Sequence, residues 1–286
     1  MGYELNKTVS LTWLCEQLEV DLPTDTEAQV LNIAPSNEVS PGSLSFTTSE
    51  EGVLATDAYY FGPKSRPEPN VICVGNPRLS FILALELLNR EAGFSTYDFE
   101  SVLPASLKIG QNVVIERGVR IGERCHIDHG VVIRSGTIIG DDCYVGPNTC
   151  IGSEGFGYER AENKIPIKFV HLGGVTIGDR VEIGALNGID RGTLGNTTIE
   201  DDTKTDNFVH IGHNVRVCTG ALLTACSEVS GGVRIGEFAW LAPNSCINQK
   251  LDIGDDAVVG LGAVVTKNVK AATIVAGNPA KYIRDV

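Results

Sequence analysis

The sequence predicts a mainly β protein, in which a left-handed parallel β-helix of hexapeptide repeats follows a small α+β domain. Aliphatic residues recur at six-residue steps from about Ile109 to Val265, and the first hundred residues lack this repeat. Many repeats continue with Gly and then an acidic or polar residue, as in Ile121-Gly122-Glu123. Gly and Asp tolerate the backbone geometry that tight turns need, so each repeat can turn a corner.

The six-residue step excludes other regular structures. A helix has a period of 3.6 and an amphipathic strand a period of 2, whereas three hexads complete one triangular coil, in which equivalent residues of successive coils stack at about 4.8 Å. A β-sandwich would show irregular spacing. Thr205 is the one repeat residue that is not aliphatic. The repeat residues are Ile109, Ile115, Ile121, Ile127, Ile133, Ile139, Val145 and Ile151, then Ile177, Ile183 and Ile189, and then Ile199, Thr205, Ile211, Val217, Leu223, Val229, Ile235, Leu241, Ile247, Ile253, Val259 and Val265.

Three parts of the chain are expected. Residues 1–100 form the α+β domain, residues 101–270 the β-helix and residues 271–286 a short basic tail. In the first part Ser10 and Asn76 are suited to cap two helices, the second of which ends near Gly93. Short apolar runs between turn residues predict strands at 30–33, 43–46, 58–61 and 71–74.

Residues 152–174 and the shorter segment 191–196 interrupt the repeat and are expected to leave the coil as loops. Sites tend to be built on loops that a rigid scaffold positions, so we expect the longer loop to cover a site. Packing against a neighbouring subunit is the alternative. The longer loop carries groups suited to binding, namely Phe156, Tyr158, Lys164 and His171.

Composition excludes several classes of function. The chain has 286 residues and a formal net charge of −13, which argues against a general binder of nucleic acid or anionic membrane. The first residues do not resemble a signal peptide, and no segment is long and apolar enough to span or insert into a membrane. A cytoplasmic protein is expected.

The eight cysteines include no Cys-x-x-Cys pair, so neither a metal site nor a disulfide framework is predicted. Cys125 and Cys143 are three hexads apart and should stack in adjacent coils as reduced core residues. The carboxy-terminal residues 261–286 carry four basic residues against one acid, and this local positive charge suits a phosphate-bearing ligand or a solvated tail. These residues are Lys267, Lys270, Lys281 and Arg284 against Asp285.

The histidines His210 and His213 form the candidate catalytic site. Ile211 between them points inward, so both should lie on the outer surface, where an imidazole titrates near neutrality. Gly231 follows His213 by three hexads and should present bare backbone in the next coil. An imidazole beside a free backbone N–H provides the base and the oxyanion donor for acyl transfer. Asp206 is a candidate for orienting the imidazole; a surface histidine without a catalytic role is the alternative.

The central motifs resemble the UDP-3-O-acylglucosamine N-acyltransferases of lipid A synthesis, and the resemblance spans nearly the whole chain. It implies that His213 is the general base, Asp206 its partner and Gly231 the oxyanion donor. It also implies a nucleotide-binding amino-terminal domain in which Phe46 stacks on the base, and a homotrimer with sites between subunits. The motifs are Gly155–Tyr158, Lys164–Pro166, Val181–Gly184, Ile189–Gly192 and Asp206–Asn214, with 58–61 and 74–77 in the amino-terminal domain.

The same resemblance supplies the remaining substrate-binding candidates: Tyr60, Gly155, Phe156, Tyr158, Lys164, Asp190, Arg191, Asn207 and His210. The ending, from Gly260 through Asn278-Pro279-Ala280-Lys281, resembles CoA-dependent hexapeptide acyltransferases that modify nucleotide-linked amino sugars. It implies contacts to the acyl donor from Gly232, Gly262, Ala263, Lys267 and Lys281.

Two features depart from the pattern of the lipid A family. That family continues past the coils into helices that engage acyl carrier protein, whereas this sequence ends about twenty residues after Val265. Acyl-CoA is therefore expected as the donor in preference to acyl carrier protein. Ser49 and Gly52 stand where the family has Asn and Tyr after the stacking aromatic, so the base on the nucleotide is left open.

The sequence therefore predicts an N-acyltransferase that moves an acyl group from a thioester to the amine of a nucleotide-linked amino sugar, without a permanently bound cofactor. The first alternative is the lipid A transferase itself, which uses a 3-hydroxyacyl group on acyl carrier protein. The second is a non-catalytic trimeric scaffold that binds the sugar nucleotide. A γ-class carbonic anhydrase needs a third zinc histidine that is not found near His210 and His213. Acyl length, the sugar and the pathway, whether lipid A, O-antigen or another surface glycan, are not determined.

Overall fold

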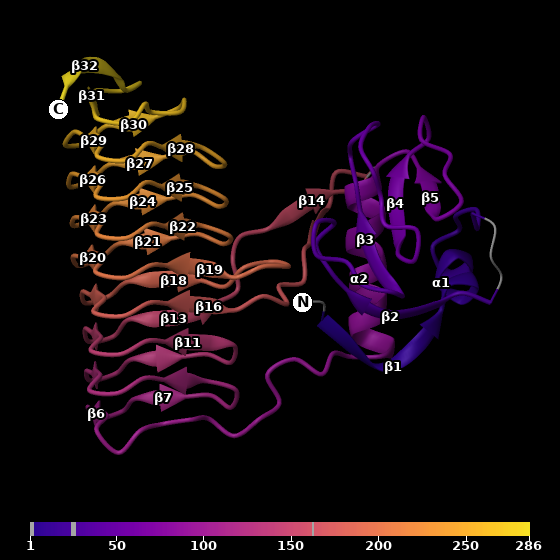
Figure 1. The fold of residues 1–286 in the computed structure, drawn as a ribbon, viewed down its shortest axis with the longest axis horizontal. Coiled ribbons are helices and arrows are strands. Elements are labelled where there is room, and N and C mark those ends of the chain that lie inside the picture. The colour runs from indigo at the N-terminus through magenta and orange to yellow at the C-terminus, as the bar shows by residue number, and fades with distance from the viewer. Residues whose placement is uncertain (1–2, 24–26, 162) are drawn as a thin grey trace. The chain divides into compact units, whose positions relative to one another are not determined.

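The computed structural model describes residues 3–23, 27–161 and 163–286 and divides into two compact units, both visible in Figure 1. The first unit contains the residues up to Thr96 together with Gly157–Leu172, and the second contains Tyr97–Phe156 and Gly173–Val286. Part of the long loop expected to belong to the β-helix is therefore part of the first unit.

The first unit is an α+β fold around one sheet. Its strands follow the order β1-β2-β3-β4-β5, with β1 antiparallel to β2 and the others parallel. Ser10 and Asn76 cap the two helices as expected, each accepting a backbone N–H three residues ahead. The elements are β1 (Tyr3–Ser10), α1 (Leu11–Gln17), β2 (Gln29–Ile33), β3 (Ser43–Phe46), β4 (Tyr59–Pro63), β5 (Val71–Val74) and α2 (Pro77–Glu91).

The long excursion adds a β-hairpin to this unit. Strand β14 (Tyr158–Arg160) pairs antiparallel with β15 (Pro166–Lys168). Arg78 of α2 forms an ion pair with Glu159 at 2.5 Å, and the ring centroids of Phe81 and Phe169 are 6.0 Å apart. The hairpin is therefore an ordered element that packs on α2, which corrects the expectation of a loop.

The second unit is a parallel β-helix whose coils stack in three sheets (Figure 1). In the described residues the eight-stranded sheet contains β7 (Val114–Ile115), β10 (Val132–Ile133), β13 (Cys150–Ser153), β18 (Gly188–Asp190), β21 (His210–Ile211), β24 (Glu228–Val229), β27 (Cys246–Ile247) and β30 (Val264–Val265). The seven-stranded sheet contains β8 (Arg120–Ile121), β11 (Thr137–Ile139), β16 (Val175–Ile177), β19 (Thr197–Ile199), β22 (Arg216–Val217), β25 (Arg234–Ile235) and β28 (Asp252–Ile253). The ten-stranded sheet contains β6 (Lys108–Ile109), β9 (His126–Ile127), β12 (Tyr144–Val145), β17 (Glu182–Ile183), β20 (Lys204–Thr205), β23 (Leu222–Leu223), β26 (Trp240–Leu241), β29 (Val258–Val259), β31 (Thr273–Ala276) and β32 (Lys281–Asp285).

The repeat residues fill the interior of the β-helix, as the period of six predicts. Ile133 pairs with Ile115 in the coil on one side and with Ile151 in the coil on the other. Ile109 and Ile115 are the exceptions among the repeat residues, and Ile109 is 50% exposed. They belong to the lowest strands of two sheets, so no strand below completes their enclosure. Cys125 and Cys143 also stack in the core, with the Cys143 N–H 3.4 Å from the Cys125 sulfur.

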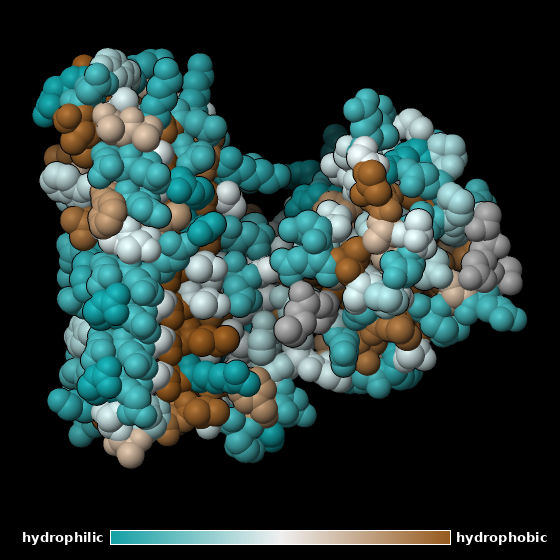
Figure 2. All heavy atoms as spheres, in the orientation of Figure 1, coloured by the Kyte–Doolittle hydropathy of each residue, from teal (hydrophilic) through white to brown (hydrophobic). Residues whose placement is uncertain are grey.

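The carboxy-terminal residues form strands, which corrects the expectation of a simple tail. Strand β31 pairs in parallel with β29, and β32 returns antiparallel to β31 at the end of the β-helix. Apolar side chains reach the molecular surface in patches among polar ones (Figure 2). Within the described ranges, no helix has the length and apolarity needed to cross a membrane.

Candidate active site

His213 lies at the corner between β21 and β22, which we call the His213 corner, and its side chain is half-buried. A Cβ atom on Gly231 in the next coil would lie 2.7 Å from both Cε1 and Nε2 of His213. A Cβ on Gly155 would lie 2.7 Å from the His213 Cβ. Both neighbours must therefore be glycine, and the predicted bare backbone beside the imidazole is confirmed.

The Gly231 N–H is available to a ligand. The carbonyl of Gly231 accepts a hydrogen bond from the Lys250 N–H at 3.0 Å. Its own N–H donates to no other group within residues 3–23, 27–161 and 163–286. This N–H can therefore donate to an oxyanion formed next to the imidazole.

Asn214 lies against the imidazole within a single chain. The Asn214 Oδ1 accepts the backbone N–H of Thr193 at 2.8 Å, so its amide nitrogen faces the other way. That nitrogen lies 3.1 Å from Nδ1 of His213. Because an amide nitrogen can only donate, this contact favours the tautomer that carries its proton on Nε2. An acceptor at Nδ1 would be needed to reverse it.

Asp206 lies at a different corner from His213. It follows β20, at the corner where the chain passes into β21, which we call the Asp206 corner. Its carboxylate accepts the backbone N–H of Asn207 at 2.7 Å. The side-chain oxygen of Asn207 accepts the N–H of Ala185 at 2.7 Å. Within one chain, therefore, Asp206 and His213 stand at opposite edges of the eight-stranded sheet.

His210 and Asp190 are brought together on the outer face of that sheet. Their Nε2 and Oδ2 atoms are 3.8 Å apart. The Asp190 side chain is buried, and this burial raises its pKa to about 6, while the nearby His210 acts in the opposite direction. Gly188 stands below His210 in the preceding coil and leaves space for the ring.

Arg191 follows Asp190, and its side chain is bound to backbone carbonyl groups of the β-helix. Its guanidinium donates from Nη2 to the Ser135 carbonyl, and its own N–H donates to the Ser153 carbonyl at 2.8 Å. Burial lowers the pKa of Arg191. Its Nε is buried and has no hydrogen-bond partner in the described part of the chain. Arg191 therefore stabilises the backbone of the coils beside the site.

The residues expected on the long excursion are divided between the two units. Gly155 and Phe156 remain with the β-helix, and Phe156 is 88% exposed. Tyr158 and Lys164 belong to the hairpin of the first unit. The Lys164 carbonyl accepts from Arg160 Nη1 at 3.1 Å.

In the first unit, Phe46 is half-buried and its ring lies 5.0 Å from that of Phe81. Tyr60 is fully buried, its hydroxyl accepts the Ala55 N–H at 3.3 Å, and burial raises its pKa. Tyr60 therefore supports the fold and cannot contact a ligand directly, which corrects the sequence expectation.

Sequence reasoning missed Arg66, which organises the loop after Phe46. Its buried guanidinium donates to the carbonyls of Glu51 at 3.1 Å and Gly52 at 2.5 Å, and pairs with Glu68. A lone arginine in a Pro-rich stretch has no local signal for such a role.

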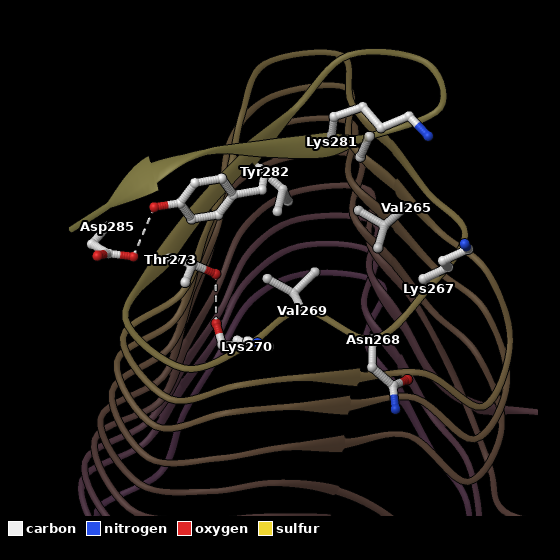
Figure 3. A pocket seen from close by; sticks show the side chains of 11 residues that line it. Val265, Lys267, Asn268, Val269, Lys270, Thr273, Lys281, Tyr282 and Asp285 are labelled. Atoms are coloured by element: carbon white, nitrogen blue, oxygen red, sulfur yellow. Dashed lines mark hydrogen bonds between the residues drawn. The ribbon is translucent and has the colours of Figure 1, made fainter.

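A cavity of about 620 Å³ lies beneath β32 at the end of the β-helix. Figure 3 shows Val265 and Val269 pointing into it, with the amines of Lys267 and Lys281 on one side of its rim. Lys270 also lines the cavity. Lys267 stands three coils above His213 at the same corner, which is a rise of about 14 Å.

The remaining donor-binding candidates are backbone positions. Gly232 and Gly262 have the positive φ angles of 73° and 63°. Ala263 is buried and its N–H donates to the Gly260 carbonyl at 3.1 Å, so its contribution to a ligand site would be indirect. Across the described residues, no group of three or more His, Cys, Asp or Glu is arranged to hold a metal.

Comparisons with known proteins agree on the fold and on a group of relatives. The family model described as bacterial transferase hexapeptide (six repeats) matches residues 118–153. The UDP-3-O-acylglucosamine N-acyltransferase of Cupriavidus taiwanensis is 31% identical over 92% of this chain and 85% of its own length. The enzyme of the same name from Coxiella burnetii is 29% identical over 90% of this chain and 85% of its own.

Among solved structures, LpxA from Acinetobacter baumannii superposes with a TM-score of 0.59 at 23% identity, covering 66% of this chain and 71% of that one. This likeness concerns the fold alone. Together with the hexapeptide match it confirms the predicted left-handed parallel β-helix.

Proposed function

The chain belongs to the family of the UDP-3-O-acylglucosamine N-acyltransferases, and from that premise we propose that it moves an acyl group from a thioester to the amine of a UDP-linked 3-O-acylglucosamine. The names of the relatives favour this lipid A type of acceptor over other nucleotide-linked amino sugars. The single observation that supports the proposal is that the His213 imidazole lies against the side-chain-free Gly231, whose N–H donates to no group in the described residues.

In the proposed reaction the neutral amine of the sugar attacks the thioester carbonyl. A C–N bond forms while the carbonyl oxygen becomes an oxyanion that accepts the Gly231 N–H. His213 takes the proton from the amine through Nε2 and then gives it to the departing sulfur as the C–S bond breaks. The products are the amide and a free thiol. No metal or redox partner is required by this balance.

To accept a proton at Nε2, the neutral His213 imidazole must carry its own proton on Nδ1. The contact with Asn214 does not favour that tautomer. A carboxylate at Nδ1 would favour it, as the aspartate does in a Ser-His-Asp triad. We assign this role to Asp206 of a neighbouring subunit, because Asp206 and His213 stand at opposite edges of one sheet in a single chain. A trimer with threefold symmetry can bring the Asp206 corner of one subunit against the His213 corner of the next.

Exposed apolar residues beside Asp206 support such a contact. Leu186 and Phe208 stack at the Asp206 corner and are 47% and 57% exposed. Leu222 and Trp240 pair on the adjoining ten-stranded sheet and are 43% and 44% exposed. Large apolar side chains that are exposed on neighbouring coils are typical of a protein interface.

The donor is expected to be a phosphopantetheine thioester, which acyl-CoA and acyl carrier protein share. Lys267 and Lys281 on the rim of the end cavity are suited to its phosphate groups. Lys267 and His213 are about 14 Å apart along the axis of the β-helix, which is about the length of four extended amino-acid residues. An extended phosphopantetheine arm can cover this distance. The phosphopantetheine arm would then run past Gln249 and Gly231, which continue the same corner.

A thiol-release assay tests the proposal. UDP-3-O-acylglucosamine would be supplied with acyl groups on CoA or on acyl carrier protein, and thiol and amide product would be counted. One amide per thiol is the expected result. Binding of the sugar nucleotide without thiol release would instead support a non-catalytic scaffold. A lower KM for one carrier identifies the donor, and Lys267→Ala should raise that KM while leaving kcat largely unchanged.

A further inference from the structure

The interior of the β-helix opens into the cavity beneath β32. The eight-stranded sheet ends with β30 and the seven-stranded sheet with β28, whereas the ten-stranded sheet continues through β31 to β32. An isolated bridge to Ile253 places Val269 one level above β28. In the described residues, therefore, no strand of these two sheets lies above Val265 or Val269, and both side chains point into the cavity (Figure 3).

The floor of this cavity is aliphatic. It is formed by four apolar residues that belong to the hydrophobic core of the β-helix or pack against it: Val265, Val269, Val275 and Ala280. Two polar side chains beside this floor already have partners. The Thr273 hydroxyl donates to the Lys270 carbonyl at 2.7 Å, and the Asn268 Oδ1 accepts the Asp252 N–H at 3.0 Å. Because the polar edges of a nucleobase would lose their hydrogen bonds to water here, the floor favours an aliphatic group.

The rim of the cavity is cationic. The amines of Lys267 and Lys281 lie on the same side of the cavity (Figure 3), and Lys270 also lines it. In the part of the chain that the structure describes, none of these three amines has a carboxylate within 4.0 Å. Asp285, the acid among the lining residues, accepts the Tyr282 hydroxyl at 3.0 Å on the opposite side. The amines are therefore available to an anion.

A ligand that matches both parts has an aliphatic chain and one anionic end. Each CH₂ group that the floor removes from water should strengthen binding about fourfold. The anionic end would accept charge-assisted hydrogen bonds from the amines. The cavity volume of about 620 Å³ lies within the range of about 300–1,000 Å³ that is typical of small-molecule sites.

We propose that the cavity beneath β32 binds single-chain anionic amphiphiles, the chemistry that alkyl phosphates and fatty-acid carboxylates share, and that the bound amphiphile competes with the acyl donor. The competition rests on the proposed function, in which Lys267 and Lys281 bind the phosphate groups of the donor. The binding itself is independent of turnover. Free single-chain anions would then slow acyl transfer.

Calorimetric titration of the whole chain tests the binding directly. The probes are butyl, hexyl and octyl phosphate below the concentrations at which they form micelles, with octanoate, inorganic phosphate and AMP for comparison. Affinity should rise about 15-fold for every two carbons added to the alkyl phosphate, and AMP should bind more weakly than octyl phosphate. The tighter of octyl phosphate and octanoate identifies the preferred anionic group.

Three variants separate the floor from the rim. Ala280→Leu fills part of the cavity without changing its charge, so the gain for every two carbons should fall below about threefold, while inorganic phosphate binds as before. Lys270→Gln should weaken octyl phosphate and inorganic phosphate by the same factor. Ala271→Leu is the matched control, because Ala271 is exposed in the same coil and does not line the cavity, and it should bind every probe like the wild type.

Thiol release tests the competition. Octyl phosphate should raise the KM for the acyl donor and leave kcat unchanged, and a higher concentration should be needed for the same effect on Ala280→Leu. An unchanged KM at concentrations of octyl phosphate that saturate the cavity would overturn the competition.

Equal affinities for octyl phosphate and inorganic phosphate would overturn the amphiphile site and leave only a basic surface. An Ala280→Leu variant that keeps the wild-type dependence on chain length would place the alkyl chain elsewhere, and tighter binding of AMP would show a nucleotide site. Absence of turnover by a chain that binds octyl phosphate as expected would refute the proposed function and the competition, and would leave the binding site in place.

Discussion

The assignment of Asp206 to a neighbouring subunit predicts that two inactive variants restore each other. His213→Ala removes the base, and Asp206→Ala removes the group that holds its Nδ1 proton. Each homotrimer should lose on the order of 10²–10⁴ in rate, the range for a general base. In one chain the two residues occupy different corners of the coil, which is why they can be supplied by different subunits.

The expected activity follows from counting sites in a mixed trimer. A site is intact only where a subunit that keeps His213 is followed around the ring by one that keeps Asp206. Every arrangement of the two variants in a mixed threefold ring contains one such site, so about one third of the wild-type activity is expected. If both residues acted within one chain, every subunit would carry one defect and no site would be intact.

The assay uses co-expression of the two variants with different affinity tags. Sequential purification on both tags isolates the mixed trimers, and thiol release is then measured per subunit. Mixed trimers of His213→Ala with wild type serve as the control for assembly. Activity at the level of the separate variants would refute the assignment of Asp206 to a neighbour. A molar mass other than that of a trimer would refute the arrangement from which the count is made.

Three further changes test single features of the structure. Gly231→Ala places a Cβ 2.7 Å from His213 Nε2, so kcat should fall about 10²-fold while the circular dichroism spectrum stays unchanged. Gly195→Ala is the control, because a Cβ at Gly195 meets no atom within 4 Å, and this variant should match the wild type in both measurements. Burial raises the pKa of Asp190 to about 6, so the wild-type chain loses on the order of 2–3 kcal/mol of stability as the pH rises from about 4 through 6 and this carboxyl ionises. Asp190→Asn cannot ionise, so it should raise the melting temperature at pH 8 but hardly at pH 4. Equal shifts at both pH values would contradict this reasoning. Arg66→Ala removes the hydrogen bonds to the carbonyls of Glu51 and Gly52 and the ion pair with the partly exposed Glu68. Urea unfolding should therefore show a loss of about 1–3 kcal/mol, the range for hydrogen bonds to a charged group, and an unchanged free energy of unfolding would show that the guanidinium does not hold the loop.

The β-helix could be predicted from the sequence because its interior positions repeat at one fixed step. Ile211 and even Thr205 are buried where the count of six places them. The same count places Gly231 beside His213, since three hexads make one coil. The count also places Asp206, seven residues before His213, at the preceding corner, because seven residues exceed one hexad.

Features that depend on distant contacts left no such pattern. The hairpin of the first unit is held by Arg78 and Glu159, which are 81 residues apart. The contact of Gly155 with His213 crosses the long excursion, where the count of six is interrupted. Within a single chain Asn214, positioned by Thr193, favours one tautomer of the imidazole, and this contact depends on the geometry of the second excursion.

The role of His213 is tested most directly by thiol release from the His213→Ala variant, with UDP-3-O-acylglucosamine and an acyl thioester as substrates. The proposed mechanism predicts a rate lower by on the order of 10²–10⁴, with the trimer and its circular dichroism spectrum unchanged. A variant that turns over at nearly the wild-type rate would contradict the assignment of the base.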